Sequence, residues 1–151
     1  MSHSDNSKAF KWIIIVSSMA LFAISLTQYA YCTEADQNGE CTQAVSVLLV
    51  GWLGIVGGGV ALTWFANPFL LLSWMLALNF TKFAVLTSGF ALLLMLSFLA
   101  FREVMVNEAG GYSKIAETCS GYWLWIASAL VMLVGNLIVM RKETNRAAAT
   151  I

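Results

Sequence analysis

The stretch from residue 44 to residue 78 constrains the fold of this chain more than any other. Residues 44–65 form an uncharged apolar run, long enough as a helix to cross a hydrocarbon core about 30 Å thick. Asn67-Pro68 follows, and proline both lacks a backbone donor and disfavours helix at the residue before it. A helix over residues 68–78 would reach only about 16 Å. The sequence therefore predicts one span over 44–65 and a short interfacial helix over 68–78.

The composition is that of an integral membrane protein. Of the 151 residues, 60% are hydrophobic and 11% are charged, whereas a soluble domain carries about 25% charged residues. The formal net charge is zero and Lys/Arg clusters are absent from the sequence, which excludes the basic surface that nucleic acid requires. We therefore expect the lipid bilayer as the surroundings, another membrane protein or a second copy as partner, and no nucleic acid.

The apolar runs predict four spans. The first run lacks a small-residue cleavage site at its end, so we expect an uncleaved span rather than a signal peptide. The predicted fold is an all-α antiparallel four-helix transmembrane bundle in a single domain over residues 1–151. Its spans lie at about residues 12–31, 44–65, 83–101 and 122–140, and its outer loops at 32–43 and 102–121.

The basic residues predict the orientation of the bundle. Four spans with a cytoplasmic N-terminus place six basic residues inside and two outside, as the positive-inside rule expects. Treating residues 68–78 as a fifth span would place four inside and four outside and so remove the asymmetry. We therefore predict cytoplasmic termini, in a bacterial inner membrane. The six inner residues are Lys8, Lys11, Lys82, Arg141, Lys142 and Arg146, and the two outer ones Arg102 and Lys114.

All three cysteines fall in the predicted outer loops. Cys32 and Cys41 flank a short acidic loop with an Asn-Gly turn, which favours a disulfide between them, worth about 2–3 kcal/mol. Cys119 is then a free thiol or an intermolecular link, although three cysteines allow three pairs. The layout superficially resembles that of the quinone-linked membrane enzymes that generate disulfides. Those enzymes need two cysteine pairs, one of them Cys-x-x-Cys, and this chain has neither.

A glycine stripe marks the second predicted span. It contains a small-x-x-x-small pattern, Gly54 to Gly58, that lets helices approach closely. The stripe is expected to pack against a helix of the same chain or, as the alternative, against another protomer. Its members are Gly51, Gly54, Gly57, Gly58 and Gly59.

Aromatic residues gather near the predicted span ends, as in the belts at membrane interfaces. These residues are Trp12, Trp64, Trp74, Tyr122, Trp123 and Trp125.

The predicted spans contain no ionisable residue, although ion-coupled transporters and proton relays usually need one. His3, the only histidine, cannot complete a catalytic triad or a metal site by itself. We expect no metal, no cofactor and no enzymatic activity. The sequence favours a small accessory, assembly or immunity-type subunit that acts through helix packing and its outer loops. The alternatives are a homo-oligomeric pore or channel and a thiol–disulfide membrane oxidoreductase.

Overall fold

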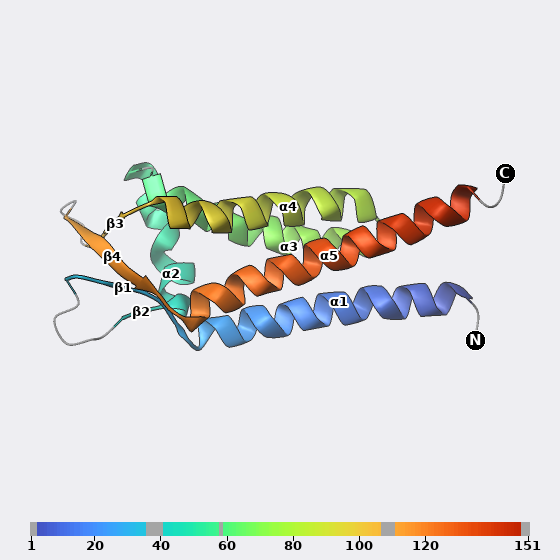
Figure 1. Ribbon diagram of the computed structural model, residues 1–151, viewed down its shortest axis with the longest axis horizontal. Helices are drawn as coiled ribbons and strands as arrows, with labels where there is room; N and C mark the ends of the chain where they lie inside the picture. The colour runs from blue at the N-terminus through green and yellow to red at the C-terminus, as the bar shows by residue number, and fades with distance from the viewer. Residues whose placement is uncertain (1–2, 36–40, 58, 107–110, 149–151) are drawn as a thin grey trace.

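Four apolar helices lie side by side and form most of the molecule (Figure 1). The computed structural model of the chain describes residues 3–35, 41–57, 59–106 and 111–148. Each helix is long and apolar enough to cross a membrane, which agrees with an integral membrane protein. Both termini lie at one end of the bundle, here called the terminal end, and a small sheet lies at the other, the sheet end. The helices are α1 (His3–Leu26), η2 with α3 (Gly59–Phe65 and Ala66–Leu76), α4 (Thr81–Ser97), extended by η3 (Phe98–Ala100), and α5 (Ser120–Ala148).

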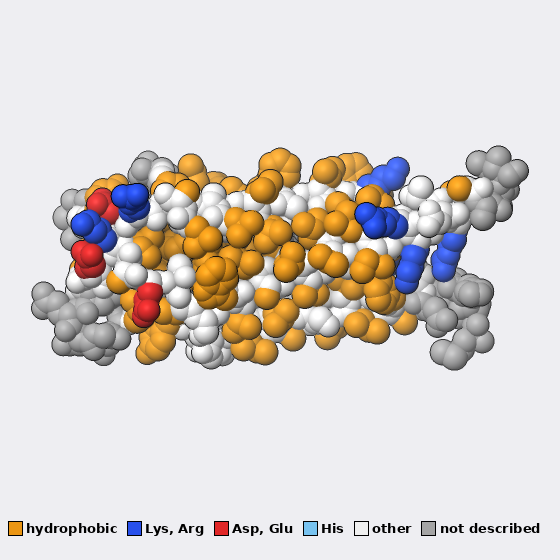
Figure 2. All heavy atoms as spheres, viewed as in Figure 1, with side chains coloured by type: hydrophobic (Ala, Val, Ile, Leu, Met, Phe, Trp, Pro, Cys, Tyr) orange, Lys and Arg blue, Asp and Glu red, His pale blue; other side chains and the backbone are white. Residues whose placement is uncertain are grey.

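Small side chains and flexible methionines fill the centre of the bundle, where α5 packs against α1 and α4, and α3 against α4. Ala84, Ala91 and Ala129 are completely buried, as are Met95 and Met132. Burial of apolar surface does not drive association between helices in lipid, so close packing of small residues takes its place. Large apolar side chains instead cover the outside, and Figure 2 shows them along the whole middle of the molecule.

Two glycines that the sequence did not single out allow the closest helix contacts. A Cβ on Gly121 would lie 2.7 Å from the backbone oxygen of Tyr29 and 3.0 Å from that of Ser25. A Cβ on Gly135 would lie 2.6 Å from Cγ2 of Ile14. The absence of a side chain at these two positions therefore sets how closely α5 approaches α1.

The second span lies elsewhere than the sequence predicts. It runs over Gly59–Leu76 rather than residues 44–65, and the predicted interfacial helix over 68–78 is wrong because this segment belongs to the crossing helix. Pro68 lies in the first turn of α3, where backbone N–H groups have no partner within the helix. Pro68 still leaves the carbonyl four residues earlier, that of Trp64, without its helical donor. The Asn67 side chain replaces that donor, with Nδ2 3.0 Å from the Trp64 oxygen.

Residues 44–57 form the first arm of a helical hairpin at the sheet end. The arm consists of α2 (Ala44–Val50) and η1 (Gly51–Gly57), and η2 forms the returning arm. Gly59, with φ of 62°, begins the returning arm in the left-handed region, which glycine adopts without steric cost. Gly58 lies outside the described residues. Because glycine costs about 1 kcal/mol per helical position relative to alanine, the run at 57–59 favours a reversal over a continuous span.

The two arms of the hairpin pack directly on each other. A Cβ on Gly51 would lie 2.9 Å from Trp64 Cδ1, and one on Gly54 would lie 3.1 Å from the Cβ of Ala61. The Trp64 indole donates to the Leu48 carbonyl across the hairpin, at 2.9 Å. Gly51 and Gly54 therefore face the returning arm of their own chain.

The prediction of an all-α fold is wrong, because the two loops at the sheet end form a four-stranded antiparallel sheet in the order β2-β1-β4-β3. The central pair, β1 and β4, joins the first loop to the second, with Tyr31 opposite Thr118 and Cys32 opposite Glu117. These strands lie far apart in sequence, and they adjoin the end of α1 and the start of α5, two helices that pack on each other. The strands are β1 (Tyr29–Thr33), β2 (Thr42–Gln43), β3 (Glu103–Met105) and β4 (Tyr112–Thr118).

A buried lysine joins three helices at the terminal end. Lys11 is 8% exposed, and its Nζ lies 3.1 Å from Glu143 Oε1 on α5. The same ammonium donates to Thr81 Oγ1 at 3.0 Å and to the Leu78 carbonyl at 3.2 Å. Lys11 lies within α1, which begins at His3 and so includes residues before the predicted first span. These contacts compensate for its burial.

Candidate functional site

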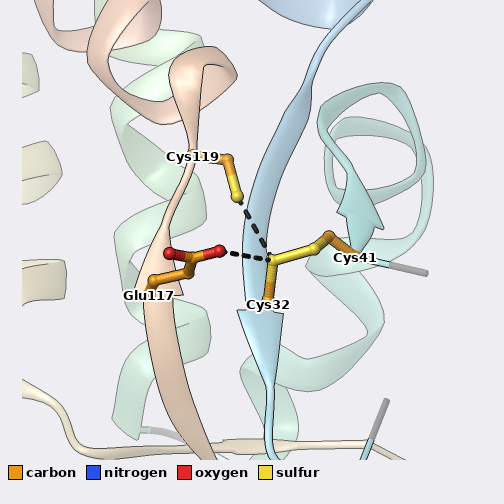
Figure 3. The surroundings of a disulfide bond; sticks show 4 residues. All are labelled: Cys32, Cys41, Glu117 and Cys119. Carbon is orange, nitrogen blue, oxygen red and sulfur yellow. Dashed lines mark hydrogen bonds between the residues drawn. A yellow bond between two sulfur atoms is a disulfide. The ribbon is translucent and has the colours of Figure 1, made fainter. Parts of the chain in front are cut away.

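The three cysteines lie together at the sheet end (Figure 3). Cys32 on β1 forms a disulfide with Cys41, which comes directly before β2. Cys119, between β4 and α5, is a free thiol. Its sulfur lies 3.4 Å from that of Cys32. A disulfide sulfur has no proton, so the Cys119 thiol is the donor in this contact.

Backbone pairing holds the Cys119 thiol at the disulfide. The Cys119 N–H donates to the Ala30 carbonyl at 2.8 Å, which ties the turn before α5 to β1. Glu117, opposite Cys32 in the sheet register, places Oε1 3.5 Å from the Cys32 sulfur. This approach is a close contact while the disulfide is closed, because neither atom carries a proton when Glu117 is ionised. Burial raises the pKa of the Cys119 thiol, and the Glu117 carboxylate raises it further.

The donor set of this cluster resembles that of a metal site, but the disulfide changes its chemistry. Cys32, Cys41, Cys119 and Glu117 each offer one ligand-type atom, and these atoms lie within 4.8 Å of one another. Thiolates bind metal ions, and the two sulfurs of a closed disulfide are not thiolates. In the oxidised state only Cys119 and Glu117 remain as ligands. The arrangement is therefore better suited to sulfur chemistry than to holding a metal.

A cavity of about 940 Å³ lies between the helical hairpin, the sheet and the adjoining ends of the helices. The hairpin supplies one wall, which includes Ser46, Val47 and Val60. Arg102 and Glu103 line the cavity at the sheet, and both are exposed. The remaining lining is mainly aliphatic and aromatic.

The polar groups deep in the cavity are already satisfied. Asn67 is 7% exposed, and its Oδ1 accepts a hydrogen bond from the Trp125 indole at 3.0 Å. The Tyr122 hydroxyl donates to the Met95 carbonyl at 2.9 Å. Because these groups are paired, the interior offers a ligand mostly apolar contact.

The sulfur cluster and the cavity lie on opposite faces of β1. Tyr31 lines the cavity and packs on Phe98, with ring centroids 5.5 Å apart. Adjacent residues of a strand point to opposite faces, which directs Cys32 away from the cavity. None of the three cysteines lines the cavity. A ligand inside it would therefore not touch the sulfur atoms.

The aromatic residues predicted for the interfaces divide into three groups. Trp12 and Trp123 are about half exposed, and they lie near opposite ends of the bundle, one on α1 and one at the start of α5. Trp74 instead donates from its indole to Ser18 Oγ at 2.9 Å, inside the bundle. The remaining three line the cavity; they are Trp64, Tyr122 and Trp125.

The sequence reasoning missed the cavity and the residues that define it. From the sequence, Asn67 was interpreted only as part of a helix break with Pro68. A polar side chain before a proline can instead supply the hydrogen bond that the proline cannot donate. Arg102 appeared only as an outer basic residue. Their proximity depends on the hairpin and the sheet, for which no local pattern was recognised. Comparison of the chain with protein-family models, curated proteins and solved structures finds no match.

Proposed function

We propose that this chain is a non-enzymatic membrane subunit that binds one amphiphile, with an apolar chain and an anionic head group, in the sheet-end cavity. The observation that carries this proposal is the cavity itself, at about 940 Å³ with a mainly apolar lining. Ligand pockets in proteins typically measure 300–1,000 Å³ and combine such linings with a few polar groups.

The charges at the sheet favour an anionic head group. Arg102 makes no ion pair among the described residues, and a guanidinium binds a carboxylate or phosphate through two parallel hydrogen bonds. Glu103 lies directly opposite Lys114 in the register of β3 and β4. Opposite charges in such a pair attract each other, which leaves Arg102 as the cation available to a ligand.

The outer face of the hairpin supports access from the bilayer. Leu49 and Trp52 do not line the cavity, and each is more than half exposed on this wall. Exposed apolar side chains at the end of a transmembrane bundle are suited to contact with lipid chains. A ligand could then enter from the membrane without its apolar chain crossing water.

A brominated long-chain fatty acid tests the proposal, because bromine quenches tryptophan at short range and Trp64 and Trp125 line the cavity. The purified protein is titrated in detergent micelles at fixed detergent concentration. We expect saturable quenching at one fatty acid per chain. Ser46→Phe, which fills the cavity from α2, should abolish the saturable part. Leu49→Phe is the matched control, because Leu49 is on the same helix but does not line the cavity.

The head-group assignment has its own test. Arg102→Gln should weaken binding of the brominated acid and leave binding of its uncharged methyl ester unchanged. Quenching that never saturates, or that is equal in Ser46→Phe and Leu49→Phe, would refute the proposal.

The proposed orientation places the sheet end outside and the termini in the cytoplasm of a bacterial inner membrane. It rests on the six basic residues predicted inside and the two predicted outside. A green fluorescent protein fused after Ile151 should fluoresce, whereas alkaline phosphatase at the same position should be inactive. The opposite pair of results would reverse the orientation.

Association with another membrane protein or with a second copy remains a further proposal. Gly51 and Gly54 pack on their own chain, so such an interface would use other surfaces. The mass of the complex in native detergent, with and without reductant, tests it. A mass of 16.5 kDa per particle in both conditions would exclude a stable oligomer, and with it a homo-oligomeric pore.

A further inference from the structure

We infer that the three cysteines form a thiol–disulfide exchange site, in which Cys119 displaces Cys41 from Cys32. The exchange moves the covalent link from the first loop to the junction of β1 and α5. The inference stands on the sulfur geometry and is independent of any ligand. Its effect on the cavity wall, argued below, rests on the proposed function.

The geometry brings the attacking atom to its target. The Cys119 sulfur lies 3.4 Å from that of Cys32, so forming a bond of about 2.0 Å requires a movement of roughly 1.4 Å. The hydrogen bond from the Cys119 N–H to Ala30 holds the backbone beside β1 before and after this movement. Figure 3 shows the Cys119 and Cys41 side chains reaching Cys32 from two different segments.

The reaction needs no external oxidant or reductant. The Cys119 thiol first loses its proton to solvent, because the thiolate is the nucleophile. The thiolate then attacks the Cys32 sulfur, the Cys32–Cys119 bond forms and the Cys32–Cys41 bond breaks. Cys41 leaves as a thiolate and takes up a proton, so the number of thiols and disulfides is unchanged.

The exchange changes which parts of the chain are linked. The Cys32–Cys41 disulfide ties β1 to the segment that enters β2 and α2. After exchange, this segment is still held by the pairing of the two-residue strand β2 with β1 and by the bond from the Ala44 N–H to the Gln28 carbonyl, at 3.0 Å. Since α2 forms a wall of the cavity, the exchange would loosen that wall and make ligand binding weaker or faster.

Burial of the Cys119 thiol and the nearby Glu117 carboxylate both slow the exchange. The groups facing the Cys119 thiol are the Glu117 carboxylate from β4 and the disulfide, which does not titrate. Burial and this negative charge keep the pKa of Cys119 above its usual value, so little thiolate is present at neutral pH. Raising the pH should therefore accelerate exchange. Glu117→Gln removes the negative charge, so this variant should reach the exchange rate of the parent protein at a lower pH.

Non-reducing peptide mapping tests the inference on the full-length protein. The protein is incubated without reductant at pH 7 and pH 9, treated with N-ethylmaleimide, and cut after glutamate. Cleavage at Glu34 and Glu40 separates Cys32 from Cys41, and cleavage at Glu103 or Glu108 releases Cys119 on a third peptide. We expect a Cys32–Cys119 linked peptide and alkylated Cys41, both increasing with pH and increasing several-fold in Glu117→Gln at pH 7.

Three controls make the result decisive. Cys119→Ser should leave Cys41 unmodified at both pH values. Glu117→Asp, which keeps the charge, should behave like the parent protein, and so should Glu34→Gln, which removes a neighbouring carboxylate at the end of β1. Alkylation confined to Cys119 at pH 9, with the Cys32–Cys41 peptide intact, would overturn the inference. Peptide mapping needs no ligand. Its result can therefore refute the exchange without bearing on the proposed ligand binding, which the brominated fatty acid titration tests.

Discussion

Asn67 is expected to stabilise α3 because of the proline that follows it, and a double-mutant cycle measures this dependence. The Asn67 amide donates to the Trp64 carbonyl that Pro68 leaves without a helical partner, and it accepts from the Trp125 indole. Asn67→Ala removes both hydrogen bonds. Side-chain hydrogen bonds between helices in membrane proteins contribute about 0.6 kcal/mol on average and up to about 1.7. We therefore expect a loss of about 1–3 kcal/mol.

Pro68→Ala changes that loss in a defined way. Alanine restores a backbone N–H that can donate to the Trp64 carbonyl, so Asn67 is no longer needed there. In the Pro68→Ala background, Asn67→Ala should cost only the Trp125 bond. The two substitutions should therefore couple by about 0.5–1.5 kcal/mol, the usual net contribution of one intramolecular hydrogen bond.

The free energy of unfolding of the four proteins is measured by titrating detergent micelles with SDS while following far-ultraviolet circular dichroism. Asn67→Ala should be the least stable, and Pro68→Ala should recover about half of the loss. A coupling energy below about 0.3 kcal/mol, within the usual range of additivity, would refute the assigned role of the Asn67 amide.

The same titration checks three further predictions. Neither polar atom of the buried Asn136 side chain has a partner among the described residues, so Asn136→Leu should stabilise the fold by about 1 kcal/mol. Gly121→Ala should cost about 1–3 kcal/mol, because its Cβ would meet backbone atoms at the end of α1 and the start of β1. Gly89→Ala, whose Cβ lies 3.9 Å from the nearest atom, should instead stabilise by up to about 1 kcal/mol. Glu143→Gln should cost about 0.5–1 kcal/mol, because it removes the ion pair with Lys11 while Glu143 is 45% exposed. A change in the free energy of unfolding of the opposite sign would refute the corresponding prediction.

Hydropathy predicted the features that depend on local composition. The membrane character, the number of spans and the shared end of the two termini follow from apolar runs separated by polar loops, and the four apolar helices agree with them. The Cys32–Cys41 pair also follows from a short intervening loop, which limits how far the two sulfurs can separate.

Features that depend on distant contacts were not predicted. The second span was placed wrongly because hydropathy treats the run through Gly51, Gly54 and Gly59 as one continuous helix. Glycine is unfavourable in a helix, and this free-energy cost favours a reversal of the chain within the run. Pro68 was interpreted as a break in the helix. The sequence does not show that the Asn67 side chain supplies the missing hydrogen bond to the Trp64 carbonyl, because this depends on side-chain geometry. The sheet was missed because β1 and β4 lie far apart in the sequence, and their pairing leaves no local pattern.

The order of the strands in the sheet has a consequence for biosynthesis. Thr33, the end of β1, and Thr118, the end of β4, are separated by 85 positions along the chain. At about 5–20 residues per second, a ribosome needs roughly 4–17 seconds to synthesise that interval. During this time β1 has only β2 as a neighbour, and Cys41 is the only other cysteine of the chain yet made. The first disulfide can thus form before the thiol that later lies beside it has been translated.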